Sequence, residues 1–124
     1  MYRVFRRALL PVLLVSLTVT SLAWALHTVL VKATPAIDGT VKAAPTDLTL
    51  WFNERPDLSL SNIRLRGPDS VMVELGGVKA GADSTALTVP VRGTMKPGKY
   101  MVLYRTAGDD GHVMRGSYSF TFQP

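Results

Sequence analysis

The sequence predicts an all-β fold, an antiparallel sandwich or barrel of about seven strands. Three observations lead to this prediction. Short runs of alternating apolar residues recur at intervals of roughly 8–12 residues. Segments rich in Gly, Pro, Asp and Ser, such as 35–39, 66–70 and 94–99, separate these runs. Beyond the first 25 residues, apolar residues at helical spacing are nowhere sustained.

The N-terminal segment has the composition of a secretory signal peptide. Three arginines lie within the first seven residues, an apolar run covers 8–22, and residues 23–25 (Ala-Trp-Ala) give a small-x-small cleavage pattern. An uncleaved membrane anchor is the alternative, because 8–26 is mostly apolar and a membrane span needs about 17–25 residues. Pro11 and the cleavage pattern favour removal, so we expect a signal peptide at 1–25.

Removal of the signal peptide leaves one small domain, 26–124, and changes the charge balance. The three arginines leave with it, so Lys and Arg fall from 14 to 11 against 9 acidic residues, and the net charge falls from +5 to +2. No basic cluster with interleaved aromatics remains, so nucleic acid is not an expected partner. The chain has no cysteine, which excludes thiolate nucleophiles, Cys-rich zinc sites and iron–sulfur clusters. Any bound metal requires His, Asp, Glu, Met or backbone atoms.

Seven segments of this domain show the alternation expected of strands. Within 47–52, for example, Leu48, Leu50 and Phe52 fall on one face and the residues between them on the other. Pro90 lacks an amide N–H, so we expect its segment to be an edge strand or to contain a bulge. The seven expected strands are 27–33, 47–52, 62–67, 71–75, 86–91, 99–105 and 116–122.

Two histidines and two carboxylates form a candidate metal site. The chain has only two histidines: His27 stands at or next to the new N-terminus, and His112 follows Asp110 at a spacing of two. In extended backbone this spacing projects both side chains to one side. Glu54 follows the segment 47–52 and is placed to lie at the same end of a sandwich.

The donor set of this site favours copper. A free α-amine, two imidazoles and a carboxylate suit tetragonal Cu(II) better than Ca²⁺ or Mg²⁺. The alternative is a purely structural turn, since Asp-Gly is a common turn pair. The residues by themselves leave both readings open.

The segment 100–122, YMVLYRTAGDDGHVMRGSYSFTF, resembles the C-terminal signature of the copper-resistance protein C family. The N-terminal half is also similar: His27 lies eight residues before Pro35 of a Pro-Ala-x-x-Gly turn, and 48–54, LTLWFNE, resembles the family's strand ending in Phe-Ser-Glu. The resemblance covers about all of 27–122. In the C-terminal signature the matching residues are Tyr100, Val102, Tyr104, Arg105, Asp110, Gly111, His112, Gly116 and Phe120.

The resemblance implies an immunoglobulin-like β-sandwich with Greek-key connections that binds Cu(II) in the periplasm. His27 would give its imidazole and, if N-terminal, its amine, while Asp110 and His112 would complete the site. Glu54 would orient a ligand or accept a hydrogen bond beside the metal. The implied function is a non-catalytic carrier or buffer that exchanges copper with an inner-membrane copper transport protein or another periplasmic copper protein.

The sequence departs from the family pattern near both ends of the proposed site. Cleavage after Ala25 leaves Leu26 ahead of His27, which predicts a chelate from the Leu26 amine, the His27 amide nitrogen and the His27 imidazole. Cleavage after Leu26 would instead free the His27 amine. Gly108 and Asn53 both replace serines, and at Gly108 we expect a loop hydrogen bond to be missing.

The methionines are scattered rather than gathered in one loop. A methionine in a strand is more often core filler than ligand. Met114, two residues after His112, is the one candidate for a Cu(I) thioether ligand.

Two other functions compete with the copper carrier. A histidine-brace copper monooxygenase shares an N-terminal histidine on a β-sandwich, although this short chain shows no extended aromatic surface for a substrate. A metal-free envelope interaction domain is the third possibility, since such sandwiches serve many functions.

Overall fold

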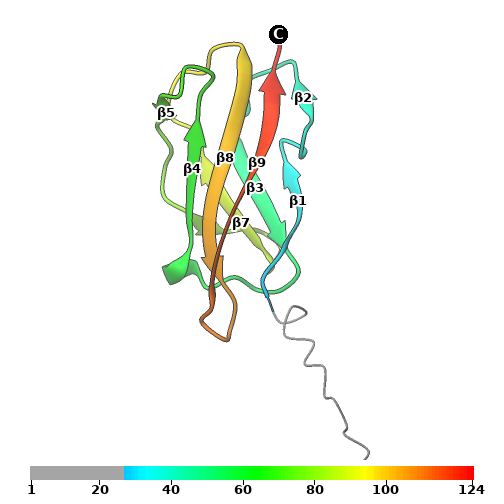
Figure 1. Cartoon of the computed structure of the whole chain (residues 1–124), viewed down its shortest axis with the longest axis vertical. Coiled ribbons are helices and arrows are strands. Elements are labelled where there is room, and N and C mark those ends of the chain that lie inside the picture. The colour runs from blue at the N-terminus through cyan, green and yellow to red at the C-terminus, as the bar shows by residue number, and fades with distance from the viewer. Residues whose placement is uncertain (1–26) are drawn as a thin grey trace, which may run out of the picture.

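The protein, seen in a computed structural model that describes residues 27–124, is a sandwich of two β-sheets (Figure 1). The expected signal peptide 1–25 lies outside the described residues. The strands are β1 (Leu30–Thr34), β2 (Thr40–Val41), β3 (Asp47–Phe52), β4 (Asn62–Arg66), β5 (Met72–Val73), β6 (Lys79–Ala80), β7 (Ala86–Pro90), β8 (Gly98–Ala107) and β9 (Val113–Phe122), with a 3-10 helix η2 (Leu58–Leu60).

The strand order confirms the immunoglobulin-like Greek-key sandwich. One sheet has the order β1-β3-β7-β6 and the other β2-β9-β8-β4-β5. The first sheet corresponds, strand by strand, to the A-B-E-D sheet of immunoglobulin domains. In the second sheet, β4, β8 and β9 correspond to strands C, F and G. Within the described residues there are nine strands rather than about seven. The two additional strands, β2 and β6, have only two residues each, and β2 pairs with β9 in parallel.

The alternation in the sequence builds the core between the sheets. Leu48 and Leu50 of β3 are fully buried, as are Leu65 of β4 and Val102 of β8. Each buried aliphatic side chain of this size stabilises the fold by about 1.5–3 kcal/mol. Aromatic pairs add to this layer, with ring centroids 5.5 Å apart in Tyr100–Phe120 and 5.6 Å in Phe52–Tyr104.

The segment 71–75 forms less strand than predicted. Only Met72–Val73 pairs continuously, with β4, and Leu75 makes a single bridge to Val91. Ser70 has a φ of 65°, which ends the preceding turn in the left-handed region, and Val71 is 61% exposed just after it. The strand therefore begins after this turn, later than predicted.

The edge-strand alternative for Pro90 was wrong, because β7 is an inner strand between β3 and β6. Pro90 is tolerated at the end of β7 for a simple reason. The ladder bond to β3 at this point is donated by the next residue, from the Val91 N–H to the Thr46 carbonyl. On its other side Pro90 acts only as an acceptor, from the Gly76 N–H.

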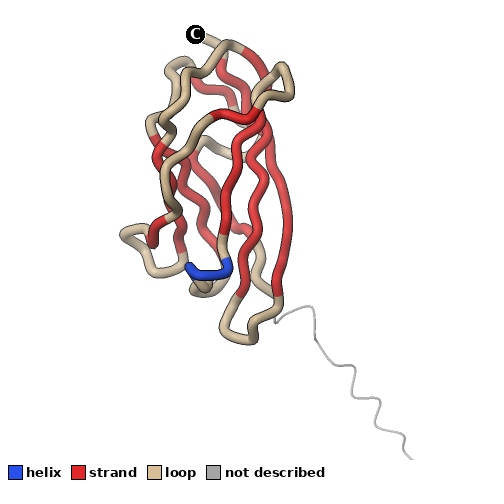
Figure 2. Tube along the Cα trace, turned by 90° about the vertical axis from the view of Figure 1, so that its left-hand side faces the viewer, coloured by secondary structure: helices blue, strands red, loops and turns tan. Residues whose placement is uncertain are grey.

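The fold brings the N-terminal arm, residues 27–29 ahead of β1, and the β8–β9 hairpin loop to one end of the sandwich. β8 and β9 pair over ten positions, from Gly98 opposite Phe122 to Ala107 opposite Val113. The loop 108–112 that joins them lies at the same end as the start of β1 (Figure 1), and η2 lies at this end too (Figure 2). The β1–β3 ladder has a bulge between Leu30 and Lys32. None of the helices in 27–124 has the length and hydropathy of a membrane span.

Candidate metal centre

The arm that carries His27 is held by Asn53, the residue after β3. The Asn53 side-chain amide donates to the His27 carbonyl at 3.0 Å and accepts from the Val29 N–H at 2.8 Å. The Asn53 backbone N–H also donates to the Val29 carbonyl, at 3.0 Å. Because an amide carries donor and acceptor on separate atoms, one side chain fixes the backbone on both sides of Thr28.

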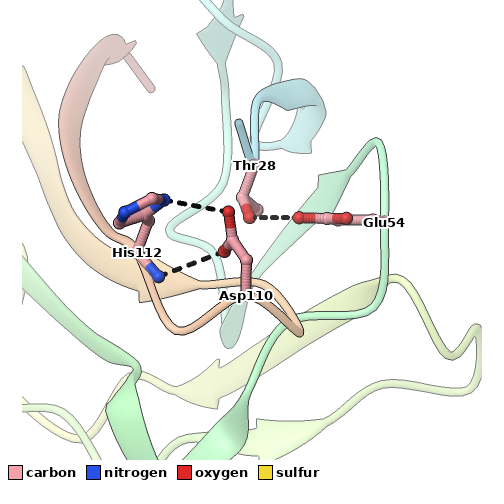
Figure 3. Close-up of polar contacts among 4 residues, drawn as sticks. All are labelled: Thr28, Glu54, Asp110 and His112. Atoms are coloured by element: carbon pink, nitrogen blue, oxygen red, sulfur yellow. Dashed lines mark hydrogen bonds and ion pairs between the residues drawn. The ribbon is translucent and has the colours of Figure 1, made fainter. Parts of the chain in front are cut away.

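Thr28, Glu54 and Gly108 form a close contact beneath the arm. Thr28 is only 5% exposed, and its hydroxyl donates to Glu54 Oε1 at 2.7 Å (Figure 3). The Glu54 carboxylate lies directly against Gly108, so that a Cβ at position 108 would overlap the carboxylate and approach Thr28 Oγ1 to 2.8 Å. Glu54 and Thr28 thus fill the space that a serine side chain at position 108 would need.

The loop 108–112 is stabilised by its own residues. The Gly111 N–H donates to the Gly108 carbonyl at 3.0 Å, and Gly111 has a φ of 75°, a conformation that favours glycine. Asp110 then accepts twice from His112: Oδ1 from the backbone N–H at 3.1 Å, and Oδ2 from ring Nδ1 at 3.0 Å (Figure 3). The carboxylate therefore fixes both the turn and the orientation of the ring.

These contacts lower the pKa of Asp110 below its ordinary value. The hydrogen bond from the His112 backbone N–H is the largest cause, and desolvation, the second largest, opposes it. The His112 side chain lowers the pKa further, through its hydrogen bond and its charge, and the charge of His27 adds a smaller contribution. Asp110 is thus an ionised carboxylate at neutral pH, close to both imidazoles.

The two histidines of the chain lie side by side although they come from opposite ends of the domain. Their ring centroids are 6.2 Å apart, with the ring planes tilted by 41°. His27 Nδ1 is buried and has no hydrogen-bond partner in the described part of the chain. A buried nitrogen without a partner is costly unless something binds it, so its lone pair is available to a metal.

The residues present fit a copper ion chemically, but they are not arranged around one point. Within 27–124, no group of three His, Asp or Glu side chains is close enough together to hold a metal ion. The Asp110 carboxylate is turned toward His112 Nδ1. Coordination by His27, Asp110 and His112 together therefore requires rotation of side chains within this group.

The remaining candidate residues lie near this group in other roles. Glu54 accepts a hydrogen bond from Thr28 and, within 27–124, makes no hydrogen bond to either imidazole. Met114 is half-buried on β9 opposite Thr106, on the same side of the strand as the buried Tyr118. This side of β9 faces the core, but Met114 is not among the partly buried residues that pack against the core cluster.

Thr28 and the role of Asn53 were not predicted from the sequence. Their partners lie 24–26 residues away in the chain. Asn53 did stand out as a departure from the family pattern, which was the only available signal. Its function depends on the β1–β3 pairing, which local patterns do not specify.

Comparison with known proteins agrees with this architecture. The CopC domain family matches residues 30–123. Protein YobA of Escherichia coli K12 is 34% identical over 116 residues, which cover 93% of this chain and 92% of YobA. The crystal structure of CopC from Methylosinus trichosporium OB3b superposes with a TM-score of 0.71 at 31% identity, covering 79% of this chain and 95% of that one. PcoC, a methionine-rich copper resistance protein from E. coli, superposes at 0.69 with 28% identity, covering 78% of this chain and 99% of that one.

Proposed function

Because the chain belongs to the CopC family, with copper resistance proteins among its relatives, we propose that it is an exported Cu(II)-binding protein. His27, Asp110 and His112 are the proposed ligands. The protein acts as a carrier or buffer in copper homeostasis and does not catalyse a reaction on copper. Its copper is taken from, or passed to, a membrane or periplasmic copper protein.

The proximity of the two imidazoles is the observation that carries this proposal. They are the only histidines in the chain, and their ring centroids are 6.2 Å apart. Imidazole nitrogens and a carboxylate oxygen form a donor set that Cu(II) binds more tightly than the other divalent first-row metals. A purely structural pair would be expected to satisfy the buried Nδ1 atom of His27.

The presence or absence of a hydrogen bond at Nδ1 favours one nitrogen of each ring as the proposed copper ligand. His112 Nδ1 is engaged by Asp110, which leaves Nε2 as the free donor atom of that ring. In His27 the available atom is Nδ1, the ring nitrogen nearer the backbone. Nδ1 is also the nitrogen that closes a chelate with the His27 backbone nitrogen. This holds whether His27 is N-terminal and uses its amine, or follows Leu26 and uses its amide.

The orientation of the Asp110 carboxylate suggests two states. Without metal it holds the His112 ring through Nδ1. On copper binding it either keeps this contact and supports His112, or turns to the metal as a ligand. Glu54 stays in its contact with Thr28 and holds the arm.

Cu(II) titration of the exported and processed protein, followed by electron paramagnetic resonance, tests this function. We expect a type-2 signal with nitrogen hyperfine structure at one equivalent of copper, and His112→Ala should abolish it. Asp109→Ala is the matched control, because this neighbouring carboxylate is exposed and makes no side-chain hydrogen bond within 27–124.

Mass spectrometry of the same sample identifies the first residue. A start at Leu26 or His27 is required for either chelate. An unchanged spectrum in His112→Ala, or a chain that keeps Met1, would contradict the assignment.

A further inference from the structure

The outer face of the five-stranded sheet carries only positive charge on its three long strands. In β4, β8 and β9, residues alternate between the buried core side and the outside. All nine acidic residues of the chain lie outside these strands. The outward positions include five cations, which we call the basic face: Arg64, Arg66, Lys99, Arg105 and Arg115.

The arginines of the basic face have no counter-charge in the described chain. The two ion pairs found within 27–124 join Lys96 to Asp69 and His112 to Asp110. Arg105 lies directly opposite Arg115 in the β8–β9 ladder. Like charges opposite one another on adjacent strands destabilise a sheet. The free protein therefore gains no stability from this pair, which favours a role in binding.

The basic face is hollowed where its cations gather. One hollow of about 340 Å³ is lined by Asn62, Arg64, Arg105 and Arg115, with Leu103 among them. A second hollow, of about 330 Å³, lies further along the same face and includes Arg66 and Lys99 with Met101. Guanidinium groups around half-buried aliphatic side chains suit carboxylates carried on a chain with some apolar character.

The basic face leads directly to the proposed copper loop. Arg105 and Arg115 are separated from the loop 108–112 by only two further residue pairs of the β8–β9 ladder. A molecule bound over these arginines would lie beside Asp110 and His112. A second copy of this chain is a poor occupant, because it would place arginines against arginines.

We propose that the basic face docks an acidic protein segment, belonging to the partner that exchanges copper with this chain. The role in exchange rests on the proposed copper function, whereas the docking itself does not. Four of the five cations are arginines, whose planar groups match carboxylates in pairs. A membrane surface fits less well, since interfacial binding needs exposed apolar side chains, and on β4, β8 and β9 only Val113 is both large and apolar and exposed, at 44%.

Titration of the metal-free protein with a synthetic Asp/Glu-rich decapeptide tests the docking by NMR. Amide shifts are expected on the outer face of β4, β8 and β9, and affinity should fall about tenfold or more from about 10 mM to about 300 mM salt. A Gln/Asn peptide of the same length should not bind. Shifts elsewhere on the domain, or none, would overturn the proposal.

Charge-reversal variants provide a second test of the docking. Arg105→Glu/Arg115→Glu should lose peptide binding, while Lys79→Glu on β6 of the other sheet should keep it.

Vesicles of anionic phosphatidylglycerol provide the comparison, and binding to them in preference to the peptide would assign the face to a membrane instead. Cu(II) titration of the same variants separates the two proposals. Failure of the unmodified protein to bind the peptide, with an intact copper signal, would refute only the docking. Failure of the unmodified protein to bind copper, with docking intact, would refute only the carrier role.

Discussion

The two histidines at the proposed copper site are held in place in different ways. His112 is oriented by its own loop, through Asp110 two residues earlier and a glycine between them. His27 has no such local support. Its arm is fixed by Asn53 and Glu54, which are 24 to 26 residues distant from their partners in the arm.

The difference shows which part of the site survives when the fold is disturbed. A local turn keeps its geometry as long as its few residues are intact, whereas the arm depends on the pairing of β1 with β3. The loop and the arm meet at Gly108, which starts the loop and contacts Thr28 of the arm and Glu54 after β3. Variants can therefore be chosen to break both supports, one, or neither.

Gly108→Ala should have the largest effect, because it disrupts both supports at once. The added methyl group would collide with the Glu54 carboxylate and lie within 2.8 Å of Thr28 Oγ1, so both side chains must move. We expect a loss of about 1–3 kcal/mol in the free energy of unfolding, measured by urea denaturation. Gly77→Ala is the matched control, since nothing lies within 4 Å of a Cβ there, and it should change stability by less than about 0.5 kcal/mol. Equal stability of the two variants would show that the Glu54–Gly108 contact is not tight.

Asn53→Ala should release the arm alone. It removes the donor to the His27 carbonyl and the acceptor for the Val29 N–H, at a cost of about 1 kcal/mol in stability for these exposed bonds. We expect Cu(II) affinity to fall about 10–100-fold, as for other residues that orient a metal ligand. Competition titration against a chelator measures this. Asn62→Ala is the control, because Asn62 is exposed and its side chain makes no hydrogen bond within 27–124. Unchanged affinity in Asn53→Ala would mean that copper orders the arm unaided.

Acid should loosen the loop and leave the Asn53 contacts of the arm in place. The pKa of Asp110 is lowered in the folded state, so its contribution to stability is present above the unfolded pKa of about 3.9 and is lost as pH falls through the lower, folded value. The Asn53 amide does not titrate. Amide exchange followed by NMR from about pH 5 to about pH 2 should show the His112 N–H losing protection before the Val29 N–H. In Asp110→Asn this pH dependence should disappear, and simultaneous loss at both amides would refute the separation.

Met114→Leu should have the smallest effect. Met114 is half-buried on the core side of β9, and leucine has nearly the same volume, so stability should change by less than about 1.5 kcal/mol. Cu(I) affinity, measured with a colorimetric chelator, should stay the same. A clear drop would identify Met114 as a thioether ligand.

Local sequence patterns predicted the long strands well and the short ones poorly. Leu48, Leu50 and Phe52 alternate as a half-buried strand must, and they are buried as expected. β2 and β6 have two residues each and leave no period to detect. They form because the neighbouring strands β9 and β7 present free ladder groups, which is a tertiary effect.

In the candidate site, contacts between residues close in sequence were predicted better than contacts between distant residues. Asp110 and His112 are close in sequence, so their proximity was predicted from spacing, but they lie in a turn and contact each other instead of projecting from an extended backbone. The meeting of His27 with His112 was a hypothesis from the residues, which left a structural turn open, and the family resemblance strengthened it. The contacts of Asn53 and Gly108 were not predicted, because they depend on side chains brought together by two different strand pairings.

The strands at the margins of both sheets bear on how this protein behaves at high concentration. Of these four strands, β2, β5 and β6 have two residues each, and β1 is interrupted by a bulge. Addition of a foreign strand, the first step toward fibrils, needs a long and regular row of free N–H and C=O groups. The sandwich offers no such template within 27–124, so it should resist amyloid-like aggregation even at high concentration.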